Sequence, residues 1–213
     1  FKDENIAPNI GMTPPLDIDI FNSATNYPGA VSYHEQRLWE GGTLTQPQNA
    51  WGSKSGTEFN YNYSIPAQDA DSIQFKIAAR ENNGIRHLVA MGDLLALTFS
   101  NIWKISGGSA DILTPLTVSA RQQTYTGAAD TRPALTGNNM VYVAARGGHL
   151  RELGYDGQGQ TYLSGDLSVR APHLFDGYEV TTLSAQVSPF PIVWSISTSG
   201  KLIGLTYIPE QQI

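Results

Sequence analysis

Short runs in which apolar and polar residues alternate make up most of this chain. The clearest is Ser72–Ala78, where Ile73, Phe75 and Ile77 occupy every second position before a turn sequence at 82–84. Residues two apart share one face of a strand, whereas helical residues would recur every three or four positions. Because no long stretch has the helical period, the pattern predicts an all-β fold.

Turn residues divide the chain into further strand candidates. We expect strands within Leu16–Phe21, Ser32–Glu40, Ala50–Lys54, His87–Met91, Leu94–Phe99 and Ile102–Ile105. Pairs of glycine follow the second and the last of these runs, and a polar stretch then extends to Met140. Residues 1–31 carry several prolines and few apolar positions, which is typical of a connecting arm.

One phrase of the sequence occurs twice. Tyr142–Asp156 reads YVAARGGHLRELGYD, and Trp194–Ile208 reads WSISTSGKLIGLTYI. The alignment places Gly148 on Gly200, Leu150 on Leu202, Leu153 on Leu205 and Tyr155 on Tyr207. Each copy is predicted to be a β-hairpin, since an apolar run stands on both sides of the glycine.

The repeat extends more weakly towards the N-terminus. In each unit, an apolar residue opens the second strand of the hairpin, and these residues are Trp51, Ile102, Leu150 and Leu202. They recur about every fifty residues, a period typical of β-propeller blades. Blades stack face to face, so consecutive apolar residues at 141–143 and 192–194 also fit. We therefore predict a β-propeller-like repeat of antiparallel blades over residues 32–213, with about four units of ~50 residues belonging to a larger propeller. A β-sandwich with two similar hairpins is the alternative.

Composition limits the classes of function. The 213 residues hold 13 Lys and Arg against 19 Asp and Glu, a net charge of −6, and no basic cluster, which disfavours tight nucleic-acid binding. With no cysteine, disulfides and thiolate chemistry are excluded. No apolar run is as long as a membrane span. The sequence starts at Phe1 in place of Met, so we expect a piece of a longer polypeptide.

The residues that could carry metal or nucleotide chemistry are scattered. His34, His87, His149 and His173 form no HExxH motif and no close pair with a carboxylate, so we expect surface or turn histidines and no metal. Ser53–Gly56 is interpreted as a hairpin turn and not a nucleophile elbow. The glycine pairs at 107–108 and 147–148 lack the lysine of a phosphate loop and are expected to have positive φ, and Asp156–Gly159 is expected to form a type I′ turn.

Glycosidase propellers provide one enzyme class to consider. Their Ser-x-Asp-x-Gly blade turn has its nearest counterpart at Ser53–Phe59, which lacks the Asp and is one residue short. Glu152, Asp156, Asp166 and Asp176 are interpreted as solvated turn carboxylates, since the sequence gives no pairing at a catalytic separation. The expectation is that the chain is not an enzyme and has no catalytic residue or cofactor.

Several phrases resemble a known protein family. They are FKDENIAPNIGMTPP, NYPGAVSYHEQRLWEGGTLTQPQNAWGSKSGTEFNY, SGGSADILTP, GHLRELGYD, DLSVRAPHLF and LTYIPEQQI, and the most specific parts are Pro28–Arg37, Pro47–Phe59 and Ala171–Phe175. Over nearly the whole chain, the sequence resembles the tail nozzle, hub or tail tubular protein B components of short-tailed bacteriophages and their prophages.

This resemblance implies a structural virion protein built around a β-propeller. Such proteins are made in the bacterial cytoplasm and form a ring of six copies between the tail adaptor and distal tail proteins, through which DNA is ejected. The family has no catalytic residues to carry over, and its members are considerably longer than this chain. A negative charge suits this role, because it would repel the phosphates of passing DNA.

A carbohydrate-binding or glycosidase-like β-propeller acting at the host surface is the alternative function. A glycan binder is expected to group exposed aromatic residues on one blade face, whereas a ring subunit should bury its Tyr and Trp in blade cores and subunit contacts. The sequence does not assign Trp39, Trp51, Trp103 and Trp194 to either arrangement.

Overall fold

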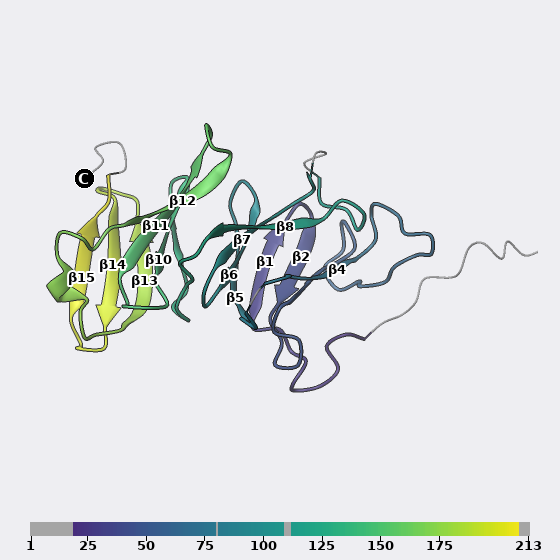
Figure 1. Cartoon of the computed structure of the whole chain (residues 1–213), viewed down its shortest axis with the longest axis horizontal. Coiled ribbons are helices and arrows are strands. Elements are labelled where there is room, and N and C mark those ends of the chain that lie inside the picture. Colours follow the sequence, from purple (N-terminus) through teal and green to yellow (C-terminus); the bar gives the residue numbers. More distant parts are fainter. Residues whose placement is uncertain (1–18, 80, 109–111, 209–213) are drawn as a thin grey trace, which may run out of the picture.

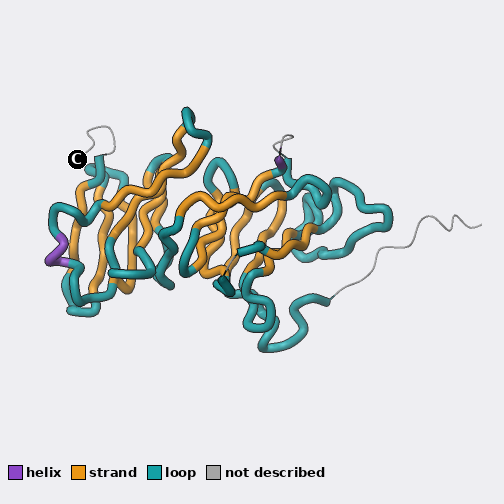
Figure 2. The backbone as a smooth tube through the Cα atoms, viewed as in Figure 1, coloured by secondary structure: helices purple, strands orange, loops and turns teal. Residues whose placement is uncertain are grey.

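The computed structural model describes residues 19–79, 81–108 and 112–208. Their strands form four antiparallel sheets that stand side by side in chain order (Figure 1). Strands and the loops that join them make up nearly all of the tube in Figure 2, and Pro172–Leu174 adds a short 3-10 helix, η2. The fold is therefore all-β, as the alternating pattern predicts.

Each sheet is one blade. The first blade contains β1 (Ala30–His34), β2 (Arg37–Gly41), β3 (Asn49–Gly52) and β4 (Ile73–Lys76). The second contains β5 (Ile85–Ala90), β6 (Leu94–Thr98), β7 (Ile102–Ser106) and β8 (Ser119–Thr124). The third contains β9 (Ala134–Thr136), β10 (Asn139–Val143), β11 (Leu150–Asp156) and β12 (Thr161–Asp166). The fourth contains β13 (Val180–Gln186), β14 (Ile192–Ser197) and β15 (Leu202–Thr206).

The connections within each blade are those of a simple meander, in which every strand pairs with its neighbour in the sequence. Between blades, β1 packs near β5 and β9 near β13, so the first strands of successive blades lie at corresponding edges. The outer strands β8 and β12 also meet. This stacking of four blades is the arrangement of a β-propeller and differs from the two facing sheets of a sandwich.

Three apolar cores fill the spaces between successive blades. In β6, Leu94 and Ala96 pack towards the first blade, while Leu95 and Leu97 pack towards the third. Strand β10 is arranged in the same way, with Met140 on one side and Val141 on the other. The expectation that both faces of the inner strands are buried is confirmed for β6 and β10, which explains why these strands are almost continuously apolar. It is wrong for β14, where Val193 is buried but Trp194 is half-buried and Ile196 is exposed.

The repeated phrase corresponds to equivalent places in the third and fourth blades. Leu150 opens β11 and Leu202 opens β15, the third strand of each blade. Leu153 and Leu205 both face the preceding blade, and Leu150 faces the following one. Leu202 shares the orientation of Leu150, but it is 64% exposed because β13–β15 stand at the end of the row.

The first anchor of the repeat needs a correction of one residue. Trp51 pairs with Glu40, on the face of the first blade that points away from the second, where its ring meets the edge of Phe21. Ile102 instead faces the following blade. Ala50 packs towards the second blade and is therefore the counterpart of Ile102. The sequence alignment selected Trp51 for its large apolar side chain, but this side chain lies on the opposite face of the strand from Ala50.

The strand expected over Ser32–Glu40 is a hairpin. Glu35 and Gln36 turn the chain between β1 and β2 with φ values of 47° and 58°. Two residues at positive φ give the sharp turn that joins twisted strands, although glycine or asparagine usually occupies these places. The sequence gives no turn signal here, because neither residue favours the left-handed conformation.

Three other segments also differ from expectation. The polar stretch before Met140 contains β8, whose side chains are mostly half-buried, and β9, in which Ala134 and Thr136 are buried. Asp19–Phe21 form no strand, and the rest of the candidate at 16–21 lies outside the described residues. Ala30 and Val31, placed in the connecting arm by the sequence pattern, are the first residues of β1.

Candidate functional site

The four histidines lie in different surroundings. Burial lowers the pKa of His87, although its ring hydrogen-bonds the carbonyl of Ala129. His34 lies beside Glu35, and His173 is part of η2. Within the described ranges, no three His, Asp or Glu side chains are grouped in a way that could hold a metal ion.

His149 has two carboxylate neighbours that the sequence did not place near it. Its Nε2 lies 3.1 Å from Oδ1 of Asp176, and its Nδ1 lies 3.7 Å from Oδ2 of Asp166. The hydroxyl of Ser168 is 2.7 Å from Nδ1 of His149. The expectation of a histidine without a close carboxylate is therefore wrong, because the β12–β13 connection folds back over β11.

This group has the residue types of a hydrolytic triad without its geometry. Ser168 is buried, and its hydroxyl also lies 2.7 Å from Oδ1 of Asp166, to which it donates. A nucleophilic serine needs a hydroxyl that faces the substrate and donates to the histidine. The contacts of Ser168 instead tie the 167–176 connection to the third blade.

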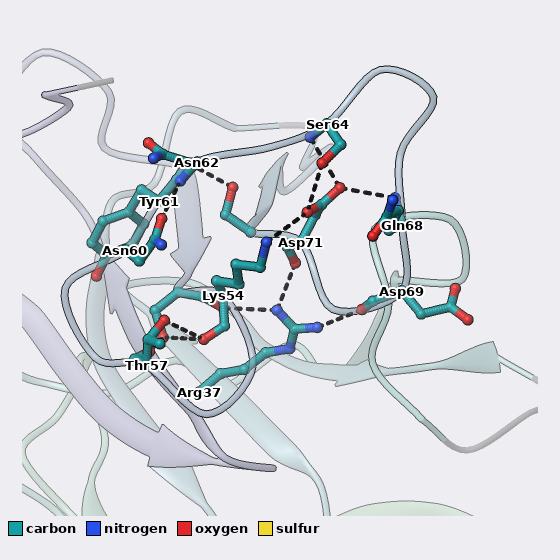
Figure 3. Close-up of polar contacts among 12 residues, drawn as sticks. Arg37, Lys54, Thr57, Asn60, Tyr61, Asn62, Ser64, Gln68, Asp69 and Asp71 are labelled. Atoms are coloured by element: carbon teal, nitrogen blue, oxygen red, sulfur yellow. Dashed lines mark hydrogen bonds and ion pairs between the residues drawn. The ribbon is translucent and has the colours of Figure 1, made fainter. Parts of the chain in front are cut away.

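A buried polar network occupies the place of the Ser53–Gly56 motif (Figure 3). The guanidinium of Arg37 donates to the carbonyls of Ser53 and Asp71 at 2.7 and 2.6 Å and to that of Asp69 at 2.6 Å. Ser53 accepts a hydrogen bond from the amide of Leu38. Ser53 is thus part of the blade's interior, and these contacts hold the long connection from β3 to β4. The hairpin turn predicted at Ser53–Gly56 is therefore wrong, because these residues only begin a connection that extends over residues 53–72.

Asp71 is the anionic centre of this network. Its carboxylate accepts hydrogen bonds from the amides of Gln68 and Ser64 at 2.8 and 3.0 Å and lies 3.4 Å from Nζ of Lys54 (Figure 3). Burial by itself would raise the pKa of Asp71, but these hydrogen bonds and Lys54 outweigh it and hold the pKa below its usual range. No motif in the sequence indicates this network, whose members are up to 34 residues apart.

The carboxylates considered for glycoside chemistry are not all turn residues. Glu152 lies in β11, where it accepts a hydrogen bond from the hydroxyl of Tyr207 at 2.7 Å, and Asp166 ends β12. Asp156 accepts hydrogen bonds from the amides of Gln158 and Gly159 in the β11–β12 turn. That turn has four residues, with positive φ at Gln160, so the predicted two-residue type I′ turn is wrong.

The glycine pairs act in turns. Gly108, Gly147 and Gly148 have φ values between 66° and 85°, as expected for positions that favour glycine. The expected positive φ is wrong for Gly107, which is glycine for another reason, since a Cβ there would collide with the carbonyl oxygen of Ile112. These glycines therefore shape loops, in agreement with the sequence interpretation.

A groove with a volume of about 1050 Å³ lies between the second and third blades. Nζ of Lys104 lies 2.8 Å from Oδ2 of Asp93, and the hydroxyl of Tyr162 donates to the same oxygen at 3.1 Å. Burial, together with the negative charge of Asp93, raises the pKa of Tyr162 to about 12. Tyr162 therefore remains a neutral donor that fixes Asp93 and Lys104 on the wall of the groove.

Tryptophan is concentrated inside the blades. Trp39 and Trp103 belong to the core between the first two blades, and Trp51 is buried under Phe21. Trp194 is half-buried and donates through Nε1 to Gln186. Several tyrosines are exposed, however, so the criterion set out above does not separate the two functions; these are Tyr27, Tyr33, Tyr63, Tyr125, Tyr155 and Tyr178.

Comparison with solved structures supports the propeller fold. The chain is similar to the WD40 domain of Pan2 from Neurospora crassa, with a TM-score of 0.50 and 11% sequence identity over 85% of this chain. It spans about half of that domain, covering 47% of it. A luciferin-regenerating enzyme also matches, with a TM-score of 0.33 and 11% identity over 84% of this chain and 72% of its own.

Fold and blade contacts together define a protein of the β-propeller class. No family model matches the sequence, and no curated protein matches it. Across the described residues there is no helix with the length and apolarity needed to cross a membrane. At 11% identity the structural likeness establishes the fold alone.

Proposed function

We propose that this chain is part of a structural virion protein, a subunit of the tail nozzle or tail tube through which a short-tailed bacteriophage ejects its DNA. The observation that carries the proposal is the resemblance of the quoted phrases to that family. Two of the most specific phrases, Pro28–Arg37 and Pro47–Phe59, supply Arg37, Ser53 and Lys54 of the buried network. The resemblance therefore includes residues with a structural role in the first blade.

The blade architecture is compatible with a ring subunit. In the ring that we propose, six copies of the full-length protein contact each other, the tail adaptor and the distal tail proteins in the virion. Cyclic symmetry requires two different surfaces of each subunit to meet, so a single substitution at that contact would affect every interface of the ring. The buried tryptophans support a packing role in such a subunit.

The charge of the chain also suits a passage for DNA. A net charge of −6 repels phosphates and disfavours the counterion release by which basic proteins bind DNA tightly. DNA would then pass through the ring without specific binding. The proposed function requires no metal, cofactor or catalytic residue.

The test is electron microscopy of the full-length protein, alone and in virions, combined with DNA binding at low salt. We expect six-fold rings below the tail adaptor and weak binding to DNA even where electrostatic attraction is least screened. A monomer in the intact tail, or tight and salt-sensitive DNA binding by the assembled ring, would contradict the proposal.

A further inference from the structure

The two sides of the groove between the second and third blades are formed by different blades. Lys104 and Arg121 come from β7 and β8, whereas Tyr155 and Gln160 come from β11 and the β11–β12 turn. The side chain of Gln123 accepts a hydrogen bond from the amide of Tyr162 at 2.9 Å and so joins β8 to β12. This contact fixes the two blades relative to each other, and the groove is preformed.

Among the described residues, the lining of the groove holds two cations, Lys104 and Arg121, and one carboxylate, Asp93. Lys104 and Arg121 are directly opposite each other on β7 and β8, where like charges destabilise a sheet. Asp93 pairs with Lys104. Among the described residues, no carboxylate oxygen lies within 4.0 Å of the guanidinium of Arg121, although this side chain lines the groove. An anionic group in the groove would relieve this imbalance, and the planar guanidinium suits a carboxylate best.

The remaining lining indicates what carries that carboxylate. Tyr155 is 50% exposed, and its ring makes an edge-to-face contact with Tyr162, with centroids 5.2 Å apart. Nζ of Lys104 lies over the Tyr155 ring, 5.5 Å from its centroid, so a sugar would pack beside this cation. Four carboxamide side chains line the same groove, and an aromatic ring together with several amides suits a hydroxyl-rich ligand better than an apolar one. These side chains are those of Gln123, Asn138, Asn139 and Gln160.

We propose that this groove binds an acidic oligosaccharide, in which Arg121 pairs with a uronate carboxylate while a sugar ring packs on Tyr155 and hydroxyls bond to the carboxamides. This binding does not depend on the proposed role in a phage tail. Assembly of a ring and recognition of a sugar are measured separately, so either can fail without the other.

The test measures binding of a galacturonate oligosaccharide to the chain by titration calorimetry and by shifts of backbone amide signals in NMR spectra. Its fully methyl-esterified counterpart has the same sugar rings without the charge, and inorganic phosphate is an anion without the sugar. We expect the acidic oligosaccharide to bind, to shift signals of β8 and β11, and to bind more tightly than the ester or phosphate.

Two substitutions separate the contributions of charge and ring. Arg121→Gln removes a charge-assisted hydrogen bond, so we expect about tenfold weaker binding of the acidic oligosaccharide, to the level of the ester. Arg170→Gln is the matched control, because Arg170 is exposed and does not line the groove, and it should leave the affinity unchanged. Tyr155→Leu keeps an apolar side chain beside Tyr162, but it removes the ring on which the sugar packs. We therefore expect weaker binding of both the acidic oligosaccharide and its ester.

Several results would overturn this inference. They include a folded wild-type chain that binds no acidic oligosaccharide, an Arg121→Gln variant that binds it as tightly as wild type, and equal affinity for the acid and the ester. Phosphate that binds as tightly as the acidic oligosaccharide would reveal an anion site without sugar recognition. Circular dichroism of each variant checks that a loss of binding is not a loss of folding.

Discussion

Leu153 and Leu202 both lie on the third strand of a blade, but their surroundings differ. Leu153 is fully buried between the second and third blades, whereas Leu202 is on the open face of the last sheet. We predict that Leu153→Ala lowers the free energy of unfolding by about 2 to 5 kcal/mol, because it leaves a cavity. Leu202→Ala should change it by less than about 0.5 kcal/mol. Urea denaturation of the two variants measures both values.

The comparison between the two leucines is its own control, since the chemical change is the same. An equal loss of stability in both variants would mean that Leu202 is covered in solution and that the last blade packs against something. Equal and negligible losses would place Leu153 outside the core.

Asp71 connects the stability of the first blade to pH. Its pKa in the folded chain lies below the ordinary value of about 3.9 for Asp, so its contribution is complete above that value and is lost as pH falls through the folded pKa. We predict that Asp71→Asn costs about 1 to 3 kcal/mol near neutral pH, because one carboxylate oxygen and the charge facing Lys54 are removed. The difference from wild type should shrink below about pH 4.

Thermal or urea unfolding at a series of pH values checks this dependence. Asp130→Asn is the control, because the side chain of Asp130 is 84% exposed and its pair with Arg86 is on the surface. It should have a much smaller effect on stability. A cost of Asp71→Asn that stays constant from neutral to strongly acid pH would show that the charge of Asp71 does not contribute.

At the scale of single elements, the β1–β2 hairpin contains a local conflict between sequence and conformation. Gln36 has a φ of 58°, a conformation that side chains with a Cβ avoid. We predict that Gln36→Gly raises the free energy of unfolding by about 0.5 to 1 kcal/mol, even though glycine gains entropy in the unfolded chain. The midpoint of urea denaturation should increase with an unchanged slope.

The same substitution inside a strand should act in the opposite direction. Gln74 is exposed in β4, where glycine loses more conformational entropy and has no side chain to pack. Gln74→Gly is therefore expected to cost about 0.5 to 1 kcal/mol. Destabilisation by both substitutions would indicate that Gln36 makes contacts more important than its backbone strain.

At the scale of the whole molecule, stability should decrease from the middle of the row of blades towards its C-terminal end. Strand β6 is buried at all five positions and packs on both faces, whereas β15 alternates between exposed and half-buried residues. We predict slow amide hydrogen exchange in β6 and β10 and much faster exchange in β15, because local opening of β15 exposes little apolar surface. Exchange measured by mass spectrometry on peptides from each blade tests this gradient, and equal protection of β6 and β15 would contradict it.

The class of fold and the main repeat could be predicted from the linear pattern alone. Period-two alternation and the duplicated hairpin around Gly148 and Gly200 depend only on neighbours within a few residues, so they can be found in the linear pattern. Burial on both faces of a strand also leaves a local sign, which is the continuous apolar run at 141–143. Glycine in the sequence also predicted several turns, because the backbone there adopts a positive φ that favours glycine.

Tertiary structure decided which residues meet across the chain. Arg37 reaches Asp71, His149 reaches Asp176, and Arg121 lines a groove with Tyr155, although no motif joins these residues in the sequence. The equivalent leucines at 150 and 202 differ in exposure only because one has a following blade and the other does not. Such contacts depend on the stacking of the blades and on the path of the loops, which are properties of the assembled chain. Local patterns therefore predict the blades. The polar network around Asp71, the contacts of His149 and the groove lined by Arg121 depend instead on how the loops and blades pack together.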